Sequence, residues 1–185
     1  MKKFLACIAL ASIPGLALSA CGGSTPSSNA SASASTAVAD HAKASLAARF
    51  LSQSTKTSLI PIATASVASC VASGFVDKIG VQQLTAYGLI DAQGNAVTTA
   101  TTTTHATSAT DASAMTDTFV GCIGDTALVA SFRAQVTSSR GLSAAAATCM
   151  TNALTADTVH SYLLATLQGH QPPVRAALIK CSTLK

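Results

Sequence analysis

The chain has 185 residues, of which 49% are hydrophobic and 10% are charged, and its formal net charge is +4 at neutral pH. This length suits one domain with a terminal extension. The basic residues are dispersed, and no run of them is interleaved with aromatic side chains, so the composition argues against a nucleic-acid-binding surface.

The first 20 residues have the layout of a secretory signal peptide. Two lysines follow Met1, and an apolar run from Phe4 to Leu16 leads into small residues. The run is too short to predict a membrane span. We expect residues 1–20 to be removed on export, which leaves nine basic and seven acidic residues and a formal charge of +2.

The end of this segment, Leu18-Ser19-Ala20-Cys21, resembles the lipobox of bacterial lipoproteins. The resemblance covers only the first two dozen residues. It implies cleavage before Cys21, covalent diacylglycerol and a fatty acyl group such as palmitate on Cys21, and a lipid-anchored domain on the extracytoplasmic side of a bacterial cell membrane or outer envelope. Gly22 does not resemble the Asp of an inner-membrane retention signal, and the choice between inner and outer membrane stays open. The alternative is an ordinary cleavable signal with a chance cysteine.

The next segment is rich in Gly, Ser and Ala and has too little apolar area to offset the entropy cost of ordering. We therefore predict that residues 21–36 form a lipidated flexible tether. A coil of this length would hold the domain about 20–25 Å from the membrane on average.

Residues 37–185 have the 3.6-residue hydrophobic period of helices, divided by capping residues, glycines and a Pro-Pro pair. The pattern predicts an all-α fold, a compact bundle of about seven short helices. The Thr-rich, low-complexity segment 91–111 interrupts it, and we favour a loop there over a strand pair. The expected helical segments are 38–50, 64–79, a shorter turn at 81–87, 111–122, 125–136, 143–154, 155–167 and 172–181.

Two stretches of the helical region match each other. Cys70-Val71-x-x-Gly74-Phe75 matches Cys149-Met150-x-x-Ala153-Leu154, and the segment ending at Cys122 matches the one ending at Cys181. The match predicts a duplicated three-helix unit, residues 60–124 and 139–185. We expect each unit to run up, down and up, so that its first and third helices are parallel.

Four cysteines in an exported chain predict two disulfides, for which sequence alone allows three connectivities. If each repeat unit closes on itself, the pairs are Cys70 with Cys122 and Cys149 with Cys181. Cross-pairing, such as Cys70 with Cys149, is one alternative. A zinc site built from the four thiolates is another, although no CxxC pair brings two ligands together. We predict no metal and no cofactor besides the lipid on Cys21.

No catalytic motif stands out. Asp157, His160 and Ser161 lie within five residues of one predicted helix, but Ser161 cannot face His160 as a nucleophile on that helix. A solvated, capped helix start explains these residues better. His41, His105 and His170 are isolated, and the common hydrolase, metalloprotease and nucleotide-binding motifs are absent from the sequence.

The sequence therefore predicts a non-enzymatic interaction or binding module, with membrane lipid as one partner and an envelope protein as another. One alternative is a carrier of an apolar ligand, with a dry cavity as its mark. A hydrolase is the other, and it would gather a histidine with acidic or hydroxyl groups from a different helix. The body also resembles Ala-rich, four-cysteine helical exported proteins of unassigned role, which implies no activity. The expected cavity lining is Phe75, Phe119, Phe132 and Leu163.

Overall fold

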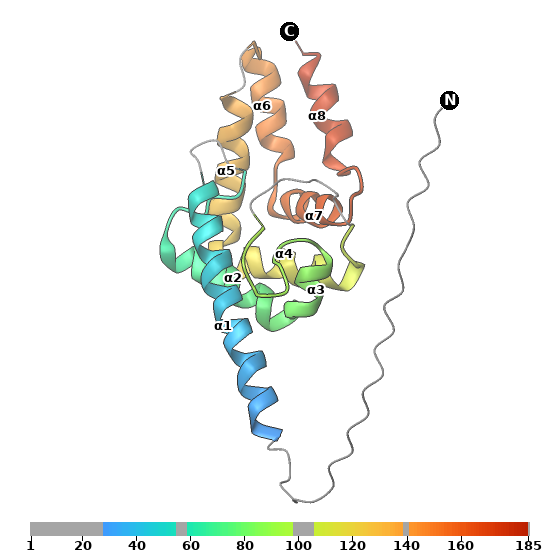
Figure 1. Ribbon diagram of the computed structural model, residues 1–185. Coiled ribbons are helices and arrows are strands. Elements are labelled where there is room, and N and C mark those ends of the chain that lie inside the picture. Colours follow the sequence, from blue (N-terminus) through green and yellow to red (C-terminus); the bar gives the residue numbers. More distant parts are fainter. Residues whose placement is uncertain (1–27, 55–58, 98–105, 139–140, 185) are drawn as a thin grey trace, which may run out of the picture.

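The computed structural model describes residues 28–54, 59–97, 106–138 and 141–184, and in these ranges the chain forms eight helices and no strand (Figure 1). The predicted all-α class is confirmed. The count exceeds seven because the short turn after residue 80 is a helix, α3. The helices are α1 (Ser28–Gln53), α2 (Ala65–Ile79), α3 (Val81–Ala86), α4 (Ala109–Ile123), α5 (Asp125–Thr137), α6 (Ala144–Ala153), α7 (Ala156–Leu167) and α8 (Val174–Ser182).

Helix α1 begins at Ser28, not near Val38 where the hydrophobic period starts. It therefore extends into the segment predicted to be a flexible tether. Alanine is the best helix former, and a helix already held by tertiary contacts adds residues at its end without a new nucleation cost. The remaining tether residues, 21–27, lie outside the described residues, as do the signal peptide and Cys21.

The core of the first half forms where α1 packs on α2. Leu46 of α1 is fully buried, and the Phe50 ring meets the Phe75 ring edge-on with centroids 5.7 Å apart. At the solvent edge of this contact, Lys43 Nζ lies 2.7 Å from Asp77 Oδ1. These contacts hold α1 along α2, and the first residues of α1 project from one end of the molecule (Figure 1).

Two helix pairs are joined by a single glycine with a positive φ. Gly80 (φ 85°) links α2 to α3, and Gly124 (φ 88°) links α4 to α5. Both lie in the pattern Phe-Val-x-x-Ile-Gly-x-x-x-Leu, at 75–84 and 119–128, which is not part of the repeat predicted above. The Phe and Leu of each copy are buried, so the pattern encodes a helix corner that packs both arms into the core.

The predicted disulfide pairing is confirmed. Cys70 is bonded to Cys122, joining α2 to α4, and Cys149 is bonded to Cys181, joining α6 to α8. The Cα–Cα distances are 5.7 and 5.5 Å, within the usual range for a disulfide. The structure thus contradicts both cross-pairing between the halves and a zinc site made of four thiolates.

The helices joined by each disulfide are antiparallel, and our prediction of parallel helices is wrong. Gly74 of α2 faces Thr118 of α4. Gly74 comes four positions after Cys70, whereas Thr118 comes four positions before Cys122, so the two helices run in opposite directions. At the other disulfide, Ser143 at the start of α6 donates a hydrogen bond to the Leu184 carbonyl just beyond α8 (2.8 Å).

The prediction failed because it treated the middle helix of each unit as a full return. Helix α3 has six residues, a length of only about 9 Å, which is too short to carry the chain back along α2. Helix α7 lies across the middle of the molecule, where it contacts α4 and α5 (Figure 1). The duplicated unit stays a prediction, since the two middle helices differ in length and in neighbours.

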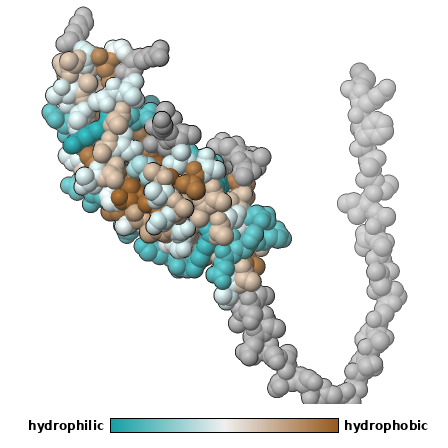
Figure 2. Space-filling view, turned by 90° about the vertical axis from the view of Figure 1, so that its left-hand side faces the viewer, coloured by the Kyte–Doolittle hydropathy of each residue, from teal (hydrophilic) through white to brown (hydrophobic). Residues whose placement is uncertain are grey.

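The upper end of the molecule is a thin layer in which α5, α6 and α8 lie side by side (Figure 1). White and beige shades cover much of the face in Figure 2, with brown apolar patches between them. Small residues and few charges account for these shades, since only 10% of the chain is charged.

A hydrogen-bonded cluster fixes the start of α4 against the end of α3. The Tyr87 hydroxyl donates to Asp111 Oδ2 (2.6 Å) and accepts from the Ser108 backbone N–H (3.0 Å). We expect Tyr87→Phe to lower the free energy of unfolding by about 1 kcal/mol, because it leaves both partners without this hydroxyl. Urea unfolding measures the loss.

Tyr162→Phe is the matched control for that substitution. The Tyr162 ring packs against Phe132 at a centroid distance of 5.1 Å, and its hydroxyl makes no hydrogen bond with the part of the chain that the structure describes. We expect this variant to unfold at the parent urea concentration. Equal losses in both variants would contradict a special role for the Tyr87 hydroxyl.

Candidate functional site

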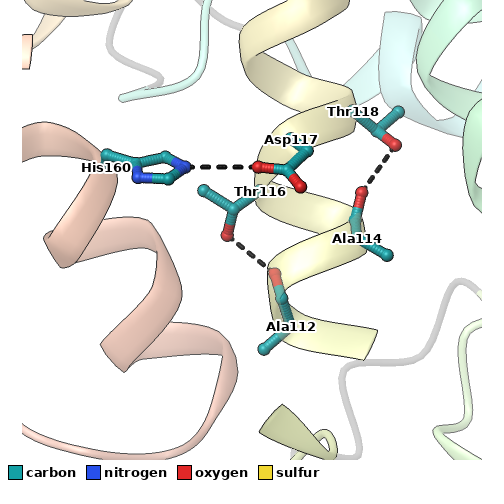
Figure 3. Close-up of polar contacts among 6 residues, drawn as sticks. All are labelled: Ala112, Ala114, Thr116, Asp117, Thr118 and His160. Carbon is teal, nitrogen blue, oxygen red and sulfur yellow. Dashed lines mark hydrogen bonds and ion pairs between the residues drawn. The ribbon is translucent and has the colours of Figure 1, made fainter. Parts of the chain in front are cut away.

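His160 meets an acidic residue from another helix. Its Nε2 lies 3.5 Å from Asp117 Oδ1 of α4, across the contact between α7 and α4 (Figure 3). The sequence had placed Asp157 beside it on α7. The side chains of His160 and Asp117 are 46% and 57% exposed, so water screens their attraction and the contact adds little stability.

The two threonine hydroxyls that flank Asp117 in the sequence of α4 are already engaged. Thr116 Oγ1 donates to the Ala112 carbonyl (2.8 Å), and Thr118 Oγ1 donates to the Ala114 carbonyl (2.7 Å) (Figure 3). Both threonines are buried, at 0% and 4% exposure, and these bonds satisfy their hydroxyls inside the core. Neither flanking threonine therefore offers the pair a hydroxyl poised as a nucleophile.

An open hollow lies between α5 and the start of α7. Its volume is about 400 Å³, within the range of small-ligand sites. Arg133 stands in its wall, where Nε and Nη2 both donate to the Leu154 carbonyl at the end of α6 (3.2 and 2.9 Å). The lining residues are Asp125, Thr126, Val129, Ala130, Arg133 and Ala156.

No motif in the sequence predicts this hollow. Its lining combines two helices that are distant in sequence, and the available signal was slight: Arg133 is the only basic residue within α5. A lone cation on an alanine-rich helix is usually a solvated side chain, so it marks no site by itself.

The four residues expected to line one apolar cavity instead pack in the core. Phe75 and Phe119 meet edge-on with centroids 5.2 Å apart, and Phe132 packs against Tyr162. All four, including Leu163, are 3–6% exposed. Phe119 also borders a smaller hollow, of about 200 Å³, beside the end of α1. In the described ranges, the structure does not bring the four together around one cavity.

A polar loop at 91–95 lies against α1. Asp91 Oδ1 accepts hydrogen bonds from the backbone N–H groups of Gln93 (2.9 Å) and Asn95 (2.8 Å), and Oδ2 accepts one from Asn95 Nδ2 (2.9 Å). Asn95 Oδ1 in turn lies 2.8 Å from His41 Nε2. The hydrogen bonds from Asn95, together with that from Gln93 and the nearby His41, lower the pKa of Asp91.

This lowered pKa predicts an acid-sensitive contribution to stability. The carboxylate of Asp91 stabilises the fold above its unfolded pKa of about 4, and the effect is lost as the pH falls through the lower folded value. We therefore expect urea midpoints of parent and Asp91→Asn to differ most near neutral pH and to converge below about pH 4.

The remaining predicted site residues fall into three groups. Cys21 and His105 lie outside the described residues, and His170 donates only its backbone N–H, to the Ala165 carbonyl (2.8 Å). The four other cysteines form the disulfides described above. Across residues 28–54, 59–97, 106–138 and 141–184, no three His, Cys, Asp or Glu side chains gather as metal ligands, and no helix is long and apolar enough to cross a membrane.

Comparison with known proteins gives one result. No family model, curated protein or solved structure matches this chain. A function must therefore be argued from the residues themselves.

Proposed function

We propose that the protein is a bacterial lipoprotein, held in a membrane by lipid on Cys21, whose helical body acts outside the cytoplasm as a non-enzymatic interaction module. The observation that carries the proposal is the presence of two disulfides behind a segment that resembles a lipobox. Disulfides persist in oxidising compartments, which is where an export signal would deliver the chain. The disulfides and the lipobox-like segment lie in separate parts of the sequence, and both are consistent with export.

The anchor chemistry suits durable attachment. A single acyl chain gives marginal, reversible membrane binding, whereas a diacylglyceryl group with a further fatty acyl chain gives stable attachment. The preference for an interaction module over a hydrolase rests on the exposed His160–Asp117 pair, whose neighbouring threonine hydroxyls are committed to α4 carbonyls. An envelope protein is the partner class that such a module would bind.

The hollow beside Arg133 favours a second candidate function, a carrier of a small, largely apolar ligand. Its volume of about 400 Å³ and its mixture of Val129, Ala130 and Ala156 with two charged side chains resemble a small-ligand site. A fluorescent apolar probe should bind the parent protein and lose binding in Ala130→Trp, which fills the hollow. Unchanged probe binding in that variant would remove this candidate.

The lipid anchor is tested by replacing Cys21 in a bacterium that processes lipoproteins. We expect Cys21→Ala to abolish membrane partition and the mass increment of the lipidated amino-terminal peptide, because no thiol remains to carry lipid. Fractionation and mass spectrometry of the purified protein give the two readouts.

Cys7→Ala is the matched control for the anchor experiment. Cys7 lies in the segment expected to be removed, so this variant should have the mature mass and membrane partition of the parent. Recovery of Cys21→Ala in the membrane fraction with an unchanged mass pattern would contradict the lipoprotein proposal.

A further inference from the structure

The hollow between α5 and the start of α7 has opposite charges at the two ends of its α5 wall. This wall consists of two rows of side chains at four-residue spacing, the spacing of neighbours on one side of a helix. One row is Asp125, Val129 and Arg133, and the other is Thr126 and Ala130. Along the helix, the lining therefore changes from an acid and a hydroxyl, through small apolar side chains, to a base.

The two charges of the hollow are not paired with each other. In the described ranges, the ion pairs involve neither Asp125 nor Arg133, and the Asp125 carboxylate accepts no hydrogen bond. Arg133 follows Asp125 by eight positions, which separates their Cα atoms by about 12 Å along the helix. A bound molecule with a charge at each end can therefore lie between them.

One edge of the Arg133 guanidinium is held by the protein and the other is free. Nε and Nη2 both donate to the Leu154 carbonyl, so the edge that they share faces the end of α6. The edge formed by Nη1 and Nη2 has no acceptor in the part of the chain that the structure describes. Its two N–H groups match the two oxygens of a carboxylate. Because Leu154 already orients the guanidinium, binding costs little side-chain entropy.

We propose that the hollow binds a small zwitterion of the amino-acid or dipeptide class that has an apolar side chain. The ligand carboxylate would pair with the free edge of Arg133 and its ammonium with Asp125, while its side chain would lie on Val129, Ala130 and Ala156. A plain carboxylate would meet Asp125 as a like charge, and a plain amine would meet Arg133 as one. A zwitterion gains from both residues.

This inference rests on the second candidate function, the carrier of a small, largely apolar ligand, and it specifies the charged groups of that ligand. The apolar part of the lining is limited to Val129, Ala130 and Ala156, and the hollow is open. A long acyl chain would therefore remain largely in water. A free amino acid and a dipeptide share the proposed chemistry, and the separation of Asp125 from Arg133 favours the dipeptide.

The experiment removes one ligand charge at a time. The chain from residue 21 to 185, with Cys21→Ala and both disulfides formed, is titrated in a calorimeter with L-leucine, L-leucyl-L-leucine, and the amide and N-acetyl derivatives of the dipeptide. We expect the unmodified dipeptide to bind most tightly. Loss of either of its charges should lower the affinity about tenfold, the effect of one charge-assisted contact.

Variants of the two charged residues identify where each ligand charge binds. Arg133→Gln should bind the dipeptide and its amide equally, because no guanidinium remains to pair with the carboxylate. Asp125→Asn should bind the dipeptide and its N-acetyl derivative equally. Each comparison uses two ligands on one variant, so a general loss of stability cancels. The matched controls Arg175→Gln and Asp40→Asn, outside the hollow, should bind the dipeptide within about threefold of the parent.

Three results would overturn the inference. The first is that neither leucine nor the dipeptide binds while the fluorescent apolar probe does, a result that would leave the carrier function standing. The second is binding of the amide or the N-acetyl derivative as tight as that of the dipeptide, which would identify a plain amine or a plain carboxylate as the occupant. The third is unchanged dipeptide binding in Ala130→Trp, which would place the dipeptide outside the hollow.

Discussion

Replacing Cys70 and Cys122 with serine should lower the free energy of unfolding by about 4 kcal/mol. The bond joins residues 52 apart in sequence, and its loss frees the unfolded chain to adopt many more conformations. Typical domains have a total stability of about 5–15 kcal/mol, so the loss is a large fraction. Urea unfolding of the oxidised parent and of the double variant measures it.

The second disulfide provides the comparison. Cys149→Ser with Cys181→Ser opens a loop of 32 residues and should cost about 3.7 kcal/mol in the same model. Hydrogen exchange separates the two variants, because loss of Cys149–Cys181 should raise exchange in α6 and α8 more than in α2 and α4. Unchanged urea midpoints in both double variants would show that neither bond constrains the unfolded chain.

Gly74→Ala should lower the free energy of unfolding by about 1–3 kcal/mol, although alanine is the better helix former. A Cβ at this position would overlap the side chain of Thr118, which is itself 4% exposed and cannot move into solvent. The antiparallel contact between α2 and α4 would have to widen, against the covalent link at Cys70–Cys122. Urea unfolding of the parent and of Gly74→Ala at constant pH measures the change in the free energy of unfolding.

Gly121 is the matched control for this position. It lies within α4, and a Cβ there would meet nothing within 4 Å, so Gly121→Ala should raise stability by about 0.5–1 kcal/mol. Adding Thr118→Ala to Gly74→Ala should recover most of the loss by making room. If Gly74→Ala stabilised the protein as Gly121→Ala does, the two helices would not be in such close contact.

Features that depend on a few neighbouring residues, such as helix starts, could be predicted from the sequence. Thr64, Ser143 and Thr155 are the first residues of three expected helical segments, and each accepts a backbone hydrogen bond at the start of the observed helix. The cysteine pairing was also accessible, because the repeat placed each pair within one segment of the chain. The relative direction of the helices joined by each disulfide could not be predicted, because it depends on whether α3 and α7 return along their neighbours or cross them.

The candidate sites were harder to predict because they join distant helices. The sequence does not show which of several aspartates lies beside His160. The packing of α7 on α4 determines that this residue is Asp117. The hollow at Arg133 likewise depends on how α5 meets the start of α7.

The pairing of the disulfides has a consequence for how the protein is made. Both bonds join cysteines that are consecutive along the described chain, Cys70 with Cys122 and then Cys149 with Cys181. In a chain that crosses a membrane amino terminus first, the first pair emerges complete before Cys149 appears. In an exported chain whose Cys21 carries lipid, an oxidase that joins thiols in order of emergence would therefore produce the native connectivity directly, without correction by a disulfide isomerase.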